Sequence, residues 1–296
     1  MARIKRRLAA NVDGDFFVDS NCIDCGTCYW MAPATFKRRG ERSHVYHQPE
    51  AAPEVFAALK ALTACPTASI GTLEKHDMDP VIDSFPDPIE GNVYHCGFHS
   101  RHSFGGASYL IVREGGNVLV DSPSFNMPLV RRIEAMGGVK HMFLTHKDDI
   151  AEHQRYADHF GCERIMHAED ITISTEGVER KIENFLPVKL ADDLIAIPTP
   201  GHTEGSMCLL YDERFLFSGD HAAWDEENEM IVAFDDACWY DWARQTESMR
   251  ILCNFKFEWI LPGHGRRVHL DAEKMTEAMR LCVLWMRRRN GPRAAL

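Results

Sequence analysis

Four potential metal ligands each follow a short apolar run in the second half of the chain. His146 follows "FLT", His202 lies in the Gly-rich turn of "IPTPGHTEGS", Asp220 follows "FLFSG", and His264 follows "ILPG". Each apolar run predicts a buried strand, so each ligand lies at or just past a strand end. Strand ends on one edge of a sheet converge in space. Imidazole and carboxylate groups that meet there suit zinc or iron.

The stretch "THKDDIAEH" around His146 contains further candidate ligands. Asp148 and Asp149 follow His146 closely, and Glu152 and His153 come slightly later. Asp149 and His153 are four residues apart, so on a helix their side chains would share one face. Two hypotheses therefore stay open: Asp149 and His153 complete this part of the site, or Glu152 and His153 do.

A second kind of metal chemistry is indicated near the N-terminus. "CIDCGTC" places Cys22, Cys25 and Cys28 at two-residue gaps, and Cys65 follows in "ACPTASI". Three closely spaced thiolates can wrap one face of an iron–sulfur cluster while a remote Cys-Pro closes the cage, as in bacterial ferredoxins. The alternative is a structural zinc site. Such sites usually pair C-x2-C with a second C-x2-C, and here the fourth cysteine stands alone, so the sequence favours the cluster.

Composition limits the partners and the compartment. The 296 residues include 45% hydrophobic and 26% charged residues, and the formal net charge is −11. This acidic balance argues against nucleic acid or an anionic membrane as partner. No apolar stretch approaches the roughly 18–20 residues that span a bilayer, and no secretory signal is evident. Ten cysteines in such a chain indicate a reducing compartment, so we expect a cytoplasmic protein.

The elements that must position these ligands alternate between strands and helices. Residues 74–92 are rich in proline and acids and predict a linker, so the predicted domains are 1–75 and 93–296, joined by a linker over 76–92. Predicted strands flank a Gly115-Gly116 turn within 107–121 and lie at 141–145, 194–198, 207–211, 214–218 and 257–261. Predicted helices lie at 127–136, 149–160, 240–253 and 271–289. A stripe of Met275, Met279, Val283 and Met286 on the last helix predicts core packing.

Two resemblances to known families follow from these motifs. Residues 10–75 resemble a single-cluster ferredoxin domain, from "FFVDSNCIDCGTCYWMAPATF" through "CPTASI". This resemblance implies a 4Fe–4S cluster on the four cysteines named above. Residues 93–270 resemble the metallo-β-lactamase fold superfamily in the order and spacing of "FLTHKDD", "PGHTEGS", "SGDH" and "PGHG". The implied fold class is an α+β ferredoxin-like small domain followed by an αββα metallo-β-lactamase-like sandwich.

The chain departs from the superfamily motif T-H-x-H-x-D-H. Thr145 and His146 match it, but Asp148 replaces the second histidine, and Ile150 and Ala151 cannot ligate. A carboxylate at this position also occurs in the flavodiiron branch of the superfamily, with Glu there, and a harder oxygen ligand shifts preference towards iron or manganese. The predicted ligands of one or two zinc or iron ions are His146, Asp148, Asp149, His153, His202, Asp220 and His264. Loss of the altered half-site, with one metal or none, is the remaining alternative.

A further cluster, "YHCGFHSRHSF", precedes the first strand pair. It contains His95, Cys96, His99 and His102. These residues could line the mouth of the active site or contact the metal. Flexible surface histidines are the simpler interpretation, and we favour it at this point.

The resemblance implies hydrolysis as the first functional hypothesis. A metal lowers the pKa of a bound water and polarises a carbonyl or phosphoryl oxygen. Asp149 is the predicted general base, with Glu152 as its alternative. The substrate would be a small ester, thioester, lactone or phosphoester.

Redox chemistry is the second hypothesis, because a hydrolase needs no electron carrier. The 4Fe–4S cluster would pass electrons to a non-haem iron site that acts on a small molecule. An electron-transfer protein would then be a partner. A third hypothesis is non-catalytic, with the cluster sensing redox state or stabilising the fold.

Overall fold

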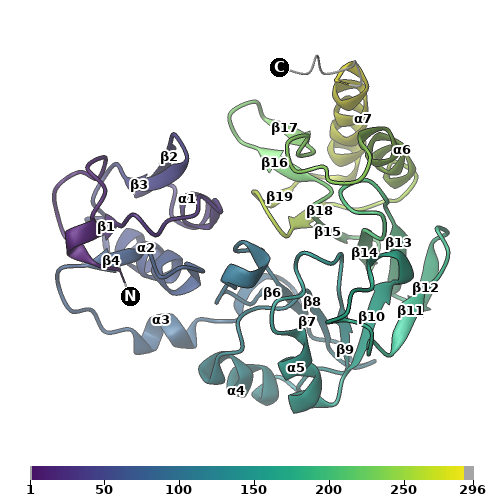
Figure 1. Ribbon diagram of the computed structural model, residues 1–296, viewed down its shortest axis with the longest axis horizontal. Coiled ribbons are helices and arrows are strands. Elements are labelled where there is room, and N and C mark those ends of the chain that lie inside the picture. Colours follow the sequence, from purple (N-terminus) through teal and green to yellow (C-terminus); the bar gives the residue numbers. More distant parts are fainter. Residues whose placement is uncertain (1, 290–296) are drawn as a thin grey trace. The chain divides into compact units, whose positions relative to one another are not determined.

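A computed structural model describes residues 2–289 of the chain, which divides into two compact units (Figure 1). The first unit comprises Met1–Met142 and Asp148–Cys162. The second unit comprises Phe143–Lys147 and Glu163–Leu296. The short strand β9 (His141–Phe143) spans the first boundary between the two units, which lies between Met142 and Phe143.

The N-terminal part of the first unit is a small α+β fold. Its elements are η1 (Ile4–Arg6), β1 (Phe16–Val18), α1 (Thr27–Met31), β2 (Phe36–Arg39), β3 (Arg42–Val45), α2 (Ala52–Ala64) and β4 (Ile70–Thr72). β1 pairs with β4, and β2 forms a hairpin with β3, both antiparallel. Phe16, Phe36 and Val45 belong to one buried core beneath these strands. The buried amide of Asn11 bonds to the backbone of Val18 and Val45, which ties β1 to β3.

The remainder of the first unit carries four strands in chain order. Its elements are α3 (Asp79–Asp83), β5 (Asp87–Glu90), β6 (Val93–His95), η2 (Arg101–Ser103), β7 (Tyr109–Ile111), β8 (Val118–Val120), α4 (Met127–Ala135) and α5 (His153–Phe160). Each strand from β5 to β8 pairs antiparallel with the next. The segment 76–92, predicted as a linker, thus contains α3 and β5. The predicted domain boundaries themselves stay a prediction.

The second unit is built on a six-stranded sheet. Its elements are β10 (Glu163–His167), η3 (Ala168–Asp170), β11 (Arg180–Ile182), β12 (Val188–Ala191), β13 (Leu194–Pro198), β14 (Met207–Tyr211), β15 (Phe215–Gly219), β16 (Ala223–Asp225), β17 (Met230–Val232), α6 (Trp242–Leu252), β18 (Trp259–Pro262), β19 (Val268–His269) and α7 (Ala272–Arg288). The strand order is β12-β13-β14-β15-β18-β19. β15 and β18 are parallel, and two antiparallel steps separate β13 from β15. Strands β13, β15 and β18 therefore end at the same edge of the sheet.

Helices α6 and α7 share a hydrophobic core with this sheet. Met249 from α6 and Met275 and Met279 from α7 are buried together with Leu216 and Ile260 of the strands. The predicted role of the methionine stripe in core packing is confirmed. α7 has 17 residues, and no helix among residues 2–289 is long and apolar enough to cross a membrane.

The prediction of a helix over 149–160 is wrong at its start. Helix α5 begins at His153, and Asp149 lies in a bend before it. Ala151 has a φ of 31°, which a right-handed helix cannot accommodate. Asp149 and His153 therefore do not share a helical face.

Replacing Met279 by Ala should destabilise the second unit. The side chain is 1% exposed, so its loss leaves a cavity and should cost about 2–5 kcal/mol. Leu284→Ala on the same helix is the matched control, because Leu284 is 50% exposed and should cost less than about 0.5 kcal/mol. Urea unfolding followed by circular dichroism measures both. Equal losses for the two variants would contradict the assigned packing.

Candidate metal centres

Four of the predicted ligands converge in the second unit. His202, Asp220 and His264 follow β13, β15 and β18, whose ends share one edge of the sheet. Nε2 of His146 and Nε2 of His202 each lie 3.7 Å from Oδ2 of Asp220. The two histidine rings are 4.7 Å apart between centroids. Parallel strand ends thus bring His202, Asp220 and His264 together, and His146 joins them from the segment that follows β9.

His264 holds the carboxylate of Asp220 from the neighbouring strand end. Its Nδ1 lies 2.8 and 2.9 Å from the two oxygens of Asp220, and its backbone N–H donates to Oδ1. Burial alone would raise the pKa of Asp220, but the charges of His264, His146 and His202 lower it below its usual value. The carboxylate is therefore ionised at neutral pH. Three imidazoles around one carboxylate form a donor set that fits zinc or iron.

The three remaining predicted ligands belong to the first unit. Asp148 is exposed, whereas Asp149 and His153 are buried. Glu152, their alternative, is already engaged: Oε2 accepts from the backbone N–H of Phe125 and forms an ion pair of 2.8 Å with Arg155. Asp149 is thus the buried carboxylate of this stretch, although which of these residues ligates stays a prediction.

Asp170, at the end of η3, organises two ligand-bearing loops and was not predicted. Its carboxylate accepts hydrogen bonds from the backbone N–H of Lys147, from the hydroxyl of Thr203 and from the backbone N–H of Gly205. These residues flank His146 and His202 in sequence. Asp170 is fully buried. No sequence signal marks it, because an acid in a turn is ordinarily exposed.

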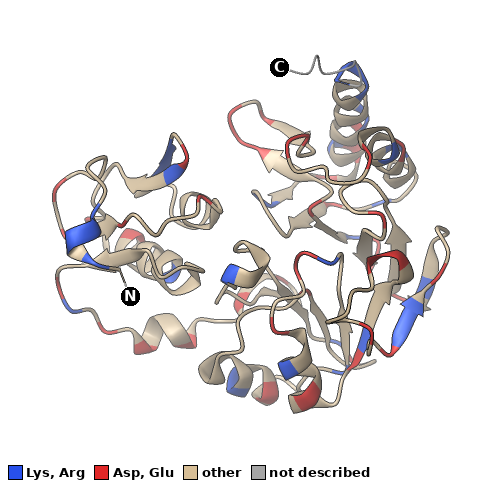
Figure 2. Ribbon diagram, viewed as in Figure 1, with Lys and Arg blue, Asp and Glu red and all other residues tan. Residues whose placement is uncertain are grey.

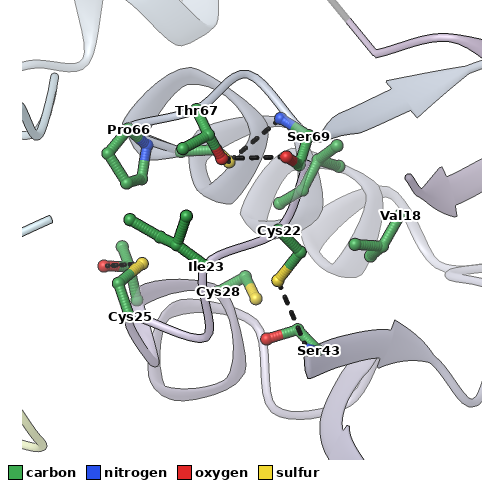
Figure 3. A pocket seen from close by; sticks show the side chains of 12 residues that line it. Val18, Cys22, Ile23, Cys25, Cys28, Ser43, Pro66, Thr67 and Ser69 are labelled. Carbon is green, nitrogen blue, oxygen red and sulfur yellow. Dashed lines mark hydrogen bonds between the residues drawn. The ribbon is translucent and has the colours of Figure 1, made fainter. Parts of the chain in front are cut away.

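The four predicted cluster cysteines line one pocket of the first unit (Figure 3). Cys65 directly follows α2, Cys28 lies in α1, and Cys22 and Cys25 lie in the loop before it. Sγ of Cys22 accepts from the backbone N–H of Ser43 at 3.4 Å. Sγ of Cys65 accepts from the N–H of Ser69 at 3.3 Å. Such bonds stabilise the thiolates that ligate a cluster and tune the reduction potential of the cluster.

Electrostatics also fits a bound cluster. Burial raises the pKa of the Cys25 thiol to about 11 and that of Cys28 well above its ordinary value. Buried thiolates need a counter-charge, and coordinated metal supplies it. Four convergent thiols with backbone donors on two of them therefore fit a 4Fe–4S cluster.

At Gly105 and Gly106 the backbone passes between the cysteine pocket and Asp149. A Cβ added to Gly105 would lie 2.8 Å from Cβ and 2.9 Å from Sγ of Cys25. A Cβ added to Gly106 would lie 2.6 and 2.7 Å from the carboxylate oxygens of Asp149. A side chain at either position would displace its neighbour, and the φ of 90° at Gly105 further favours glycine there. All four residues belong to the first unit, so a single peptide unit separates the contact with Cys25 from the contact with Asp149.

The interpretation of His95 and His99 as surface histidines is wrong, because both are buried. Their Nε2 atoms lie 2.8 Å apart. Nδ1 of His99 donates to the carbonyl of Gly105 at 2.7 Å and lies 3.1 Å from Oγ1 of Thr27, the first residue of α1. Only His102 of this group is exposed. The alternation of histidines with small and polar residues in this segment gave no periodic signal of burial.

Comparison with known proteins identifies the N-terminal segment and the larger fold. Residues 18–72 match the family model described as the 4Fe-4S single cluster domain of Ferredoxin I. YobT, an uncharacterized protein of Bacillus subtilis (strain 168), is 23% identical over 205 residues, covering 58% of this chain and 88% of YobT.

Three solved structures have similar folds. TMB-1 has a TM-score of 0.55 at 14% identity, covering 69% of this chain and 97% of its own. The DIM-1 metallo-β-lactamase has a TM-score of 0.53 at 15% identity, covering 67% and 95%. A metallo-β-lactamase from Pontibacter korlensis has a TM-score of 0.52 at 15% identity, covering 68% and 97%.

These findings establish the class of fold. The chain combines a small N-terminal ferredoxin-like 4Fe–4S domain with a metallo-β-lactamase-like α/β fold, as the sequence predicts. The likeness to lactamases at such low identity concerns the fold, so the reaction must be argued from the chain's own residues.

Asp170→Asn should weaken metal binding by disturbing both ligand loops. An amide replaces one acceptor oxygen by a donor, so one of the hydrogen bonds from Lys147, Thr203 or Gly205 is lost. Changes to such supporting residues typically lower metal affinity about 10–100-fold. Titration with a chelator measures the affinity. Glu169→Gln is the matched control, since Glu169 is the exposed neighbour, and an equal effect there would count against the assigned role.

His221 should make stability fall as the pH decreases below about 6.5. Burial, with a smaller contribution from the charge of His202, lowers the pKa of His221 to about 3. The unfolded chain binds this proton near pH 6.5, so between pH 7.5 and 5 the folded state should lose about 2 kcal/mol of unfolding free energy. The His221→Asn variant should lose correspondingly less unfolding free energy over the same pH range. Unfolding at both pH values, with chelator present in every sample, measures the difference, and an unchanged pH dependence would refute it.

Proposed function

We propose that this protein is a redox enzyme in which electrons held at the cysteine site reach a metal ion at the Asp149 site. A 4Fe–4S cluster, when bound, supplies electrons one at a time. The substrate would be a small molecule that is reduced or oxygenated at the second metal. The cytoplasm is the compartment we propose, in line with the ten cysteines.

The observation that carries this proposal is the path from Cys25 to Asp149. The backbone passes close to the Cys25 side chain at Gly105 and close to the carboxylate of Asp149 at Gly106, the next residue. Electron tunnelling falls steeply with distance, so a path of one peptide unit flanked by two close non-bonded approaches favours transfer. Hydrolysis itself needs no electron carrier at this position.

The ligand chemistry supports the same proposal. Asp148 supplies an oxygen donor where the superfamily motif has its second histidine, and Asp149 adds a carboxylate one residue before the position of the motif aspartate. Oxygen-rich sites favour iron over zinc. Asp149 lies three residues after His146 in the chain, and both belong to the predicted ligand set. In this proposal Asp149 is a metal ligand at the end of the electron path.

Hydrolysis is the second candidate, favoured by the geometry around Asp220. Three imidazoles around a buried, ionised carboxylate also suit a zinc ion that activates water. The fold shared with metallo-β-lactamases supports this candidate as well. In that case Asp149 would act as the general base on a small ester, thioester, lactone or phosphoester.

Metal content separates the two candidates. We expect anaerobically purified protein to hold about four irons with matching sulfide and additional iron. A variant with Cys22, Cys25 and Cys28 changed to Ser should lose the sulfide and keep the additional iron, which the predicted His and Asp ligands would hold. Zinc in place of that iron would favour hydrolysis and overturn the redox proposal.

Asp149→Asn tests the electron path directly. The cluster is reduced by a light pulse, and its return to the oxidised state is followed by absorbance and electron paramagnetic resonance. In the parent, the second metal should accept the electron; in the variant, cluster reoxidation should slow to the rate seen when the second metal is absent. His102→Gln, an exposed change in the same segment, should leave the rate unchanged. Parent-like reoxidation in Asp149→Asn would exclude this path.

A further inference from the structure

We propose that the hairpin of β2 and β3 is the docking surface for an acidic electron-carrier protein that reduces the cluster. The surface, here called the basic hairpin, consists of Lys37, Arg38, Arg39 and Arg42. The inference rests on the proposed function in one respect: it takes the cysteine site as the place where electrons enter. It adds the surface beside the cysteines on which the electron donor docks and the kind of protein that the donor is.

The basic hairpin adjoins a cluster ligand. The backbone N–H of Ser43, in β3 directly after Arg42, donates to Sγ of Cys22, and Ser43 lines the cysteine pocket (Figure 3). Cys22, like Cys25 and Cys65, is half-buried, whereas Cys28 is buried. A protein seated on this hairpin therefore lies next to a half-buried ligand of the proposed cluster, Cys22.

The positive charges of the hairpin are exposed and concentrated. Figure 2 shows blue segments on the β2–β3 hairpin, and all four basic residues are exposed. Arg39 lies directly opposite Arg42 in the strand register. Like charges directly opposite destabilise a hairpin, so the stability of the fold does not explain this pair. Within residues 2–289, neither of these two arginines has an ion-pair partner within 4 Å, unlike Arg38, which pairs with Asp24 at 2.7 Å.

A second element brings positive charge to the same cysteine. The guanidinium of Arg6, in the turn η1, donates to Oδ1 of Asn21 at 3.0 Å, and Asn21 directly precedes Cys22. Residues 1–75 contain ten Lys and Arg against eight Asp and Glu, although the whole chain has a net charge of −11. The positive charge is thus local to the part of the chain that holds the cysteines.

Charge complementarity indicates an acidic protein as the occupant. Opposite charges on two surfaces steer encounter and raise association rates about 10–1,000-fold. Such steering suits a carrier that must dock, transfer one electron and leave quickly. Nucleic acid and anionic membranes would also be attracted to Arg39 and Arg42, but neither would make use of the adjacent Cys22, and the strongly acidic remainder of the chain repels an extended polyanion.

The test measures reduction of the cluster in the full-length holoprotein by stopped flow. The probe is a chemically reduced, acidic 2Fe–2S ferredoxin, and reduced methyl viologen, a small cation, serves as the second reductant. The variant is Arg39→Glu with Arg42→Glu. The matched control is Arg287→Glu with Arg288→Glu, which changes the net charge equally on the exposed end of α7.

At low ionic strength, we expect the ferredoxin to reduce the hairpin variant about tenfold more slowly than the parent. This difference should shrink at high salt. The control should change less than about twofold. Reduction by methyl viologen should persist in all variants. A parent-like rate in the hairpin variant, or an equal fall in the control, would overturn the proposal. So would a hairpin variant that keeps its ferredoxin rate but loses binding to duplex DNA or phosphatidylglycerol vesicles.

Two further measurements keep the result unambiguous. If the double Glu variant lacks the cluster signal, Arg39→Gln with Arg42→Gln replaces it, and an unchanged ferredoxin rate there overturns the proposal. Reoxidation of the cluster by the second metal is recorded separately. Slow reduction by ferredoxin with no reoxidation would support the docking surface and reject the proposed function, so the two ideas fail independently.

Discussion

The close approach of the backbone at Gly105 and Gly106 is the constraint on which the arrangement of the first unit depends. One glycine faces the side chain of Cys25 and the next faces the carboxylate of Asp149, so a Cβ at either position would displace its neighbour. The carbonyl of Gly105 also accepts from buried His99. The same two residues thus fix the separation between the cysteine pocket and a predicted metal ligand, and they anchor a buried histidine pair beside it.

The second unit meets a different requirement, which is to hold donors rigidly around one carboxylate. Parallel alignment of β15 and β18 brings Asp220 and His264 to the same sheet edge, and Asp170 ties together the loops that flank His146 and His202. Burial would favour a protonated Asp220, but the surrounding imidazoles outweigh it. Rigid strands and a supporting carboxylate therefore hold the donor set in place.

The predictable parts of the molecule were those with a local sequence signal. Apolar runs located the strands that end at His202, Asp220 and His264, and cysteine spacing located the cluster pocket. The unpredictable parts depend on contacts distant in sequence. A positive φ at Ala151 ends any helix through Asp149, the burial of His99 depends on Thr27 and Gly105, and Asp170 gains its role only from loops on other strands.

The Gly-Gly pair also offers a diagnostic for other fused chains. A C-x2-C-x2-C segment joined to a metallo-β-lactamase-like fold does not by itself indicate that the two metal sites communicate. A chain with a bulky residue where Gly105 stands must hold its backbone farther from the cysteine loop, because a Cβ here would overlap Cys25. Under the proposed redox function, the residue at this single position would therefore indicate whether the backbone can approach the cysteine loop closely enough to serve as an electron path.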